Sequence, residues 1–153
     1  MEKSVLNLYG KSLEVKCINS WTAGLNLKFL GCSSGWTEFQ RSCYILVQSS
    51  YYWTDADLHC RGLGANLTSI HSKEENDFIF SLASNYDIWI GGTLESYQQW
   101  RSTDGSSWDY EYWIADQPSY GGDDSVSMDD DQNGAWRDME TTEDTRYFVC
   151  RMF

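Results

Sequence analysis

The strongest helical pattern of the chain lies just before its middle. Ser72 and Glu75 stand at the spacing of a capping box, in which the serine hydroxyl accepts the amide hydrogen of Glu75 and the carboxylate reaches back. Apolar residues follow at positions 78, 79, 82 and 83, which share one face of a helix. A shorter helix is predicted over residues 55–62, with Thr54 as its cap and the glycines at 62 and 64 closing it.

Strand patterns flank these two helices. Aromatic and β-branched residues from Trp36 to Gln48 predict a hairpin, and residues 65–70 predict a short strand. Residues 87–92 predict a buried strand stopped by two glycines. Residues 1–31 carry short alternating stretches and predict one or two short strands or an extended arm. A length of 153 residues suits a single domain of average size after this arm.

Residues 104–144 lose the regular pattern. They hold 13 of the 23 acidic residues, one basic residue, Arg137, and the only proline, Pro118. Long irregular segments in compact domains are usually functional. Trp108, Trp113 and Trp136 lie inside this segment and are expected to pin it to a core. We therefore expect the function in this loop.

Charge and hydropathy exclude several classes of protein. With 11 basic and 23 acidic residues the formal net charge is −12, which argues against nucleic acid and against anionic membrane surfaces as partners. No apolar run approaches the length of a membrane-spanning helix. The first residues show no apolar signal segment, so a secreted form would have lost its signal before this numbering begins.

The chain contains five cysteines and two histidines. No Cys-x-x-Cys pair is present, and His59 and His71 do not stand at zinc-finger spacing. An odd number of cysteines in an acidic, tryptophan-rich domain indicates an oxidising compartment and one spare thiol. Four paired cysteines allow three pairings, and five reduced thiols in a cytosolic protein remain the alternative. Both histidines are assigned structural roles, because no serine or cysteine pattern beside them indicates a catalytic triad.

Seven motifs from Cys32 onward resemble the C-type lectin-like domain in its long form. In chain order they are Cys32-x-x-x-Trp36 with Cys43-Tyr44, Ala56-x-x-x-Cys60, Gly64-Ala65-x-Leu67-x-x-Ile70, Trp89-Ile90-Gly91-Gly92, Trp113-x-x-x-Gln117-Pro118-Ser119, Trp136-Arg137-Asp138 and Phe148-Val149-Cys150. The resemblance implies an α+β fold over residues 32–153, with two helices, two small antiparallel sheets and a long ligand-binding loop.

The resemblance also implies the disulfides Cys60–Cys150 and Cys32–Cys43. A third bridge, usual in the family, is missing, since its positions here are Ser125 and Thr141. We expect a looser long loop, or one held by hydrogen bonds and neighbouring chains. Cys17 has no family partner, and an interchain disulfide in a dimer is preferred over a free thiol.

The family's ligand site surrounds a cis-proline, here Pro118. In sugar-binding members a calcium ion and the flanking residues hold vicinal hydroxyls of the sugar. The matching positions are Gln117, Ser119, Asp123, Arg137 and Asp138. Gln117 matches galactose-type sites, but Arg137 replaces a ligating asparagine. Unit charges 4 Å apart at an effective dielectric of about 20 interact by roughly 4 kcal/mol, so a guanidinium beside Ca²⁺ would cost about 8.

We therefore expect Arg137 to take the place of the metal and to bridge Asp123 and Asp138. In the alternative, Gln117, Asp123 and Asp138 bind calcium in a galactose-type site. A second family calcium site is not expected, because Leu94 and its neighbours lack the acids.

Other residues complete the expected sugar site. Tyr120 offers an aromatic face, and Asn133 and Arg137 are expected to donate to an acetamido carbonyl, which suits N-acetylated hexoses such as GalNAc or GlcNAc. Asp129 to Asp131 is interpreted as a solvated acidic turn in preference to a cation site. Asn66 begins an N-glycosylation sequon.

The sequence as a whole predicts a secreted, extracellular, non-enzymatic lectin. It resembles invertebrate humoral lectins, such as those of bivalves, that recognise or agglutinate microbial surface glycans, and a Cys17-linked dimer would raise avidity. The rival class is a protein-binding or ice-binding member of the family that has lost sugar recognition. A glycosidase with two catalytic carboxylates is disfavoured, because nothing marks one acid as the proton donor.

Overall fold

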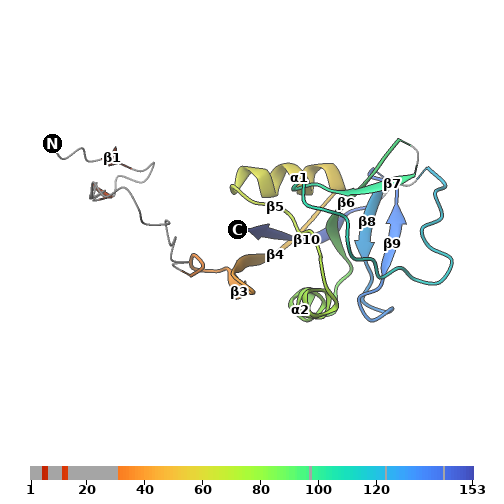
Figure 1. The fold of residues 1–153 in the computed structure, drawn as a ribbon, viewed down its shortest axis with the longest axis horizontal. Coiled ribbons are helices and arrows are strands. Elements are labelled where there is room, and N and C mark those ends of the chain that lie inside the picture. Colours follow the sequence, from red (N-terminus) through yellow and green to blue (C-terminus); the bar gives the residue numbers. More distant parts are fainter. Residues whose placement is uncertain (1–4, 7–11, 14–30, 97, 123, 143) are drawn as a thin grey trace, which may run out of the picture.

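A computed structural model describes residues 5–6, 12–13, 31–96, 98–122, 124–142 and 144–153 (Figure 1). Within these residues the strands are β1 Val5–Leu6, β2 Ser12–Leu13, β3 Thr37–Phe39, β4 Ser42–Tyr51, β5 Asn66–Leu67, β6 Ile88–Glu95, β7 Gln99–Ser102, β8 Ser125–Met128, β9 Trp136–Met139 and β10 Arg146–Met152. The helices are α1 Trp53–Gly62 and α2 Lys73–Ala83. The α+β class is confirmed.

The strands form one large mixed sheet and one small pair. The sheet has the order β3-β4-β10-β6-β8-β9, with β5 added to β10 and β7 added to β6, while β1 pairs with β2. The parallel pairing of β10 with β6 joins what the resemblance implies as two antiparallel sheets. Figure 1 shows α1 and α2 on opposite sides of β10, so the C-terminal strand lies at the centre of the domain.

The two helices begin differently. The Ser72 hydroxyl accepts a hydrogen bond from the amide of Glu75 at 3.1 Å, which confirms the predicted cap of α2. The Glu75 carboxylate does not return to Ser72; it accepts from the amide of His71 and from the Tyr44 hydroxyl. The predicted cap of α1 is wrong, because Thr54 lies inside the helix and the capping residue, Tyr52, makes no side-chain capping bond.

Both disulfides that the resemblance implies are present. Cys32 is bonded to Cys43, and Cys60 in α1 is bonded to Cys150 in β10. The second bridge spans a sequence separation of 90 residues and ties the first helix to the last strand. Cys17 lies outside the described residues, so the interchain disulfide expected there stays a prediction.

The hydrophobic core includes tryptophans of the irregular segment 104–144 as well as residues of the helices. Trp136 is 1% exposed and Trp113 packs against its cluster, so the core roles expected for these two tryptophans are confirmed. Trp89 is fully buried in a second core cluster. Buried Asn76 in α2 accepts from the Trp136 indole nitrogen at 2.8 Å and donates to the Gly134 carbonyl at 3.1 Å. These two bonds fix the turn before β9 to the helix.

The segment 104–144 is more regular than its pattern indicates. It contains the antiparallel hairpin of β8 and β9. In place of the missing family disulfide, the Ser125 hydroxyl donates to the Met139 carbonyl at 2.7 Å. The long loop is therefore held by strand pairing and hydrogen bonds, one of the two outcomes expected from the sequence.

Candidate functional site

A tight turn from Gln117 to Tyr120 lies against Asp138 of β9. The Gln117–Pro118 peptide is cis, as predicted. The Gln117 side-chain oxygen accepts from the amide of Ser119 at 3.2 Å. One carboxylate oxygen of Asp138, Oδ2, accepts from the Ser119 hydroxyl at 3.2 Å and from the Tyr120 amide at 2.9 Å. The structure thus brings together four of the predicted site residues.

The second carboxylate oxygen of Asp138 is the distinctive atom of this turn. Asp138 is 3% exposed, and its Oδ1 is buried with no hydrogen-bond partner in the described part of the chain. A buried acceptor left unpaired costs about 1–3 kcal/mol. Tyr120, 39% exposed, stands next to it as an accessible aromatic ring. The turn therefore combines a buried acceptor that lacks a partner with an exposed aromatic residue.

Arg137 does not belong to this turn, and the expected bridge to Asp138 is wrong. Its guanidinium pairs with Asp129 at 2.7 Å. Arg137 and Asp138 are neighbours on β9, and successive side chains of a strand point to opposite faces. Asn133 lies in the turn before β9, where its backbone N–H donates to the Asp130 carbonyl at 3.2 Å, and its role in sugar binding stays a prediction.

The acidic turn at 129–131 is only partly solvated. Asp129 is 4% exposed and accepts from Arg137 and from the Ser127 hydroxyl, so the solvated interpretation is wrong for this residue. Burial raises the pKa of Asp129, and the charge of Arg137 opposes that increase without cancelling it. Asp129 is a buried partner of Arg137 on the opposite face from the Gln117–Tyr120 turn.

The described donors at the turn do not fit calcium. Calcium takes six to eight oxygen ligands with several carboxylates among them. Asp138 supplies the one carboxylate, its Oδ2 is occupied by two donors of the chain, and the Gln117 oxygen already accepts from Ser119. Among the residues that the structure describes, no group of three acidic, histidine or cysteine side chains could hold a metal. Asp123, the other predicted carboxylate, lies outside them.

A second polar cluster fixes the start of the long loop to the core. His71 Nδ1 lies 2.7 Å from the Asp109 carboxylate, and its Nε2 lies 3.1 Å from the Ser69 hydroxyl and 3.2 Å from that of Ser106. This connectivity resembles a Ser–His–Asp relay. Both serine hydroxyls, however, donate to Asp104, at 2.6 and 2.5 Å.

The cluster is therefore structural. A hydroxyl carries one proton, and a serine that donates it to Asp104 is not activated as a nucleophile by His71. The structural role predicted for His71 agrees with this geometry. His59 packs its ring against Tyr51 and Phe148, which also agrees. The sequence offered no signal for the cluster, because residues 69–71 and 104–109 meet only in the fold.

The chain is similar to proteins that contain a C-type lectin domain. The family model for the lectin C-type domain matches residues 49–152. A lectin of Pleurodeles waltl is 38% identical over 132 residues, which is 78% of this chain and 75% of that protein. Dromaiocalcin-2 of Dromaius novaehollandiae is 31% identical over 79% of this chain and 95% of its own length.

Two solved structures resemble the fold equally well. The carbohydrate-recognition domain of cow CD23, described with a GlcNAc2Man3 oligosaccharide, has a TM-score of 0.75 and 29% identity, covering 80% of this chain and 96% of that one. A calcium-independent type II antifreeze protein has a TM-score of 0.75 and 27% identity, covering 80% and 94%. No helix of the described residues is long and apolar enough to cross a membrane.

Proposed function

Because the chain belongs to the lectin C-type domain family, we propose that it binds carbohydrate at the Gln117–Tyr120 turn and Asp138. The observation that supports this most directly is the buried, unpaired Oδ1 of Asp138. When the Gln117–Tyr120 turn moves aside to admit the ligand, a sugar hydroxyl donates to this oxygen, which is buried in the free protein, and the C–H edge of the sugar packs on the Tyr120 ring. Gln117 and Ser119 orient the turn and contact neighbouring hydroxyls.

We propose that this binding needs no calcium, for a reason that differs from the sequence prediction. Oδ2 of Asp138 already accepts from the Ser119 hydroxyl and the Tyr120 amide, and the Gln117 side-chain oxygen already accepts from Ser119, so the described residues of the turn offer few oxygens to a metal. The arginine that departs from the family pattern lies on the opposite face of β9 and plays no part.

The finer features of the function remain part of the proposal. The ligand is a galactose-type or N-acetylated hexose, and the protein is a secreted humoral lectin that recognises microbial glycans, similar to those of invertebrates. Pairing of two chains through Cys17 would place two weak sites at high effective concentration and raise avidity. N-glycosylation at Asn66 belongs to the same set of proposals.

The test is glycan-array binding with competition by free sugars, with and without EDTA. We expect competable binding that persists in EDTA. Asp138→Asn should weaken it about 10- to 100-fold, the value of a hydrogen bond to a charged group. Asp124→Asn, at an exposed acid nearby, is the matched control. Tyr120→Ala supplies a second test at an exposed position if Asp138→Asn does not fold. Binding that both variants leave unchanged would overturn the proposal.

Ice or protein binding is the second candidate, and the similarity to a calcium-independent antifreeze protein favours it. Thermal hysteresis of the purified chain separates the two functions. Hysteresis together with an array on which no signal is competed by free sugar would replace the lectin proposal.

A further inference from the structure

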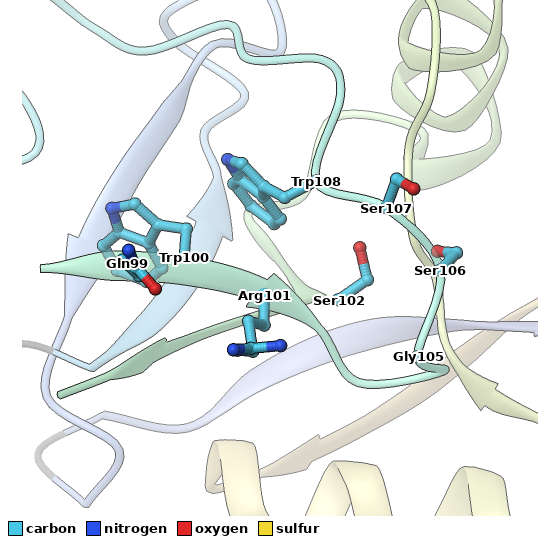
Figure 2. A pocket seen from close by; sticks show the side chains of 8 residues that line it. All are labelled: Gln99, Trp100, Arg101, Ser102, Gly105, Ser106, Ser107 and Trp108. Carbon is cyan, nitrogen blue, oxygen red and sulfur yellow. The ribbon is translucent and has the colours of Figure 1, made fainter.

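The structure contains a cavity of about 570 Å³ beside β7. Its walls are residues 99–102 of β7 and residues 105–108, which follow after a turn. Figure 2 shows the chain reversing at Gly105 and returning past the strand. Among the described strands β7 pairs with β6 alone, so its second edge is left unpaired. No residue of this cavity belongs to the Gln117–Tyr120 turn or to Asp138.

The inner wall carries a polar group that the protein does not use. Ser102 is 8% exposed, and its hydroxyl makes no hydrogen bond within the described residues. Figure 2 shows this hydroxyl directed between Trp108 and the Gly105–Ser106 backbone. Gln99 at the rim is exposed, and its carboxamide likewise has no partner in the described chain. Donors and an acceptor are thus available to a ligand.

Two tryptophans supply the aromatic surface. The rings of Trp100 and Trp108 stack with centroids 6.0 Å apart. The Trp108 indole nitrogen donates to the Glu111 carboxylate at 2.6 Å, which fixes the orientation of the ring. Trp100 is 7% exposed and supports the ring of Trp108, which is partly accessible. A partly accessible aromatic ring beside amide and hydroxyl groups is suited to ligands that have apolar C–H edges and polar substituents.

The charge at the rim cancels locally. Arg101 pairs with Glu95 at 2.5 Å, and both side chains are more than half exposed. Among the described residues that line the cavity, Arg101 is the one charged residue, and its pairing with Glu95 leaves this lining without an unpaired charge. The composition of the walls therefore favours an uncharged ligand.

We propose that this cavity is a second saccharide site, which takes an N-acetylated hexose unit. The acetamido carbonyl accepts from the Ser102 hydroxyl, the C–H edge of the ring packs on Trp108, and Gln99 bonds ring hydroxyls at the rim. The proposal goes beyond the function assigned to the turn, because the two sites share no residue and bind independently.

The experiment is a titration of ¹⁵N-labelled protein with N-acetylgalactosamine, which is both galactose-type and N-acetylated, in EDTA, followed by amide and indole N–H signals. We expect two groups of shifts with separate dissociation constants, one at Ser119, Tyr120 and Asp138, the other at residues 101–108. Ser102→Leu removes the hydroxyl and narrows the cavity at its inner wall, and it should weaken the second group at least tenfold while leaving the first unchanged. Ser49→Leu, at an exposed serine of β4, is the matched control.

Gln99→Ala is a milder variant at an exposed position, for use if Ser102→Leu does not fold. It should weaken the second group about three- to tenfold, the value of one neutral hydrogen bond. Shifts at the turn alone would overturn the second site and leave the proposed function intact. Shifts at residues 101–108 alone would support the second site and reject the turn. Shifts at neither place would reject both.

Discussion

At the scale of single residues, two neighbouring candidates for the binding site have their side chains on opposite faces of one strand. Arg137 and Asp138 belong to one motif, and a match to that motif puts both in one site. On β9 their side chains point to opposite faces. Asp138 therefore lies under the turn, while Arg137 pairs with Asp129 on the other side.

Replacement of Arg137 tests this assignment. Arg137→Asn should lower the free energy of unfolding by about 1–3 kcal/mol, because Asp129 is buried and loses its cation, although the exposed part of the pair is screened by solvent. Urea unfolding followed by tryptophan fluorescence measures the change. Arg101→Asn, at an exposed ion pair, should cost less than about 1 kcal/mol. A gain in calcium affinity in Arg137→Asn would instead restore the idea that this side chain blocks a metal site.

Asp104 is a residue at which burial and hydrogen bonding compete. Burial raises its pKa, but the hydrogen bonds from Ser106 and Ser69 and the charge of Arg151 lower it, and the lowering prevails. The folded protein then binds this proton less tightly than the unfolded chain. The stabilising contribution is therefore complete above the ordinary carboxyl pKa of about 4 and is lost as the pH falls below it.

Asp104→Asn should accordingly reduce the loss of stability on acidification. The free energy of unfolding, measured in urea between about pH 3 and pH 7, should depend less on pH than in the parent protein. Asp116→Asn is the matched control, since Asp116 is exposed and has a positive φ that asparagine tolerates equally well. An unchanged pH dependence in Asp104→Asn would show that other carboxylates account for acid sensitivity.

At the scale of secondary structure, local hydrogen bonding explains which boundaries were predictable. Ser72 and Glu75 make the capping bond that their spacing predicts, so the start of α2 was correct. The start of α1 has no side-chain cap, and Thr54 was chosen for its residue type alone. Strand β8 was missed because Ser125 and Ser127 are fully buried, and β9 because Asp138 is buried: polar residues at buried positions break the alternation by which a strand is recognised in a sequence.

Alanine substitutions at the starts of the two helices can be compared in one experiment. Ser72→Ala should destabilise the protein by about 1 kcal/mol, because the amide of Glu75 loses its acceptor. Thr54→Ala should change the free energy of unfolding by less than about 0.5 kcal/mol, since Thr54 caps no helix. Thermal and urea unfolding of both variants measure the difference. Equal losses in the two variants would contradict the assigned helix boundaries.

At the scale of the whole molecule, two long-range connections place the loop on the core. Cys60–Cys150 ties α1 to the central strand, and Asn76 ties α2 to the turn before β9. The disulfide pairs followed from the family resemblance, and the structure confirms both. The role of Asn76 was not predicted, because its partners lie 58 and 60 residues away in the chain.

The loss of unfolding free energy on removal of a disulfide should increase with the length of the loop that the disulfide closes. Replacing Cys60 and Cys150 by alanine should cost about 4–5 kcal/mol, because the bridge closes a loop of 90 residues in the unfolded chain. Replacing Cys32 and Cys43, separated by 11 residues, should cost about 3 kcal/mol. Denaturant unfolding of the two double variants compares them, and a larger loss for the short loop would contradict the entropic explanation.

The sequence by itself determined the family, both helices, the two disulfides and the turn at Pro118, because these depend on residue types at short spacings or on a recognisable order of motifs. Only the tertiary structure showed which face of β9 lies against the turn and that Asp129 is buried and paired with Arg137. It also showed that His71 contacts Asp109 and that Ser102 lines a cavity. The reason is physical. Periodicity reports the face of a single element, whereas these contacts depend on how distant elements pack, and a residue's letter does not contain that information.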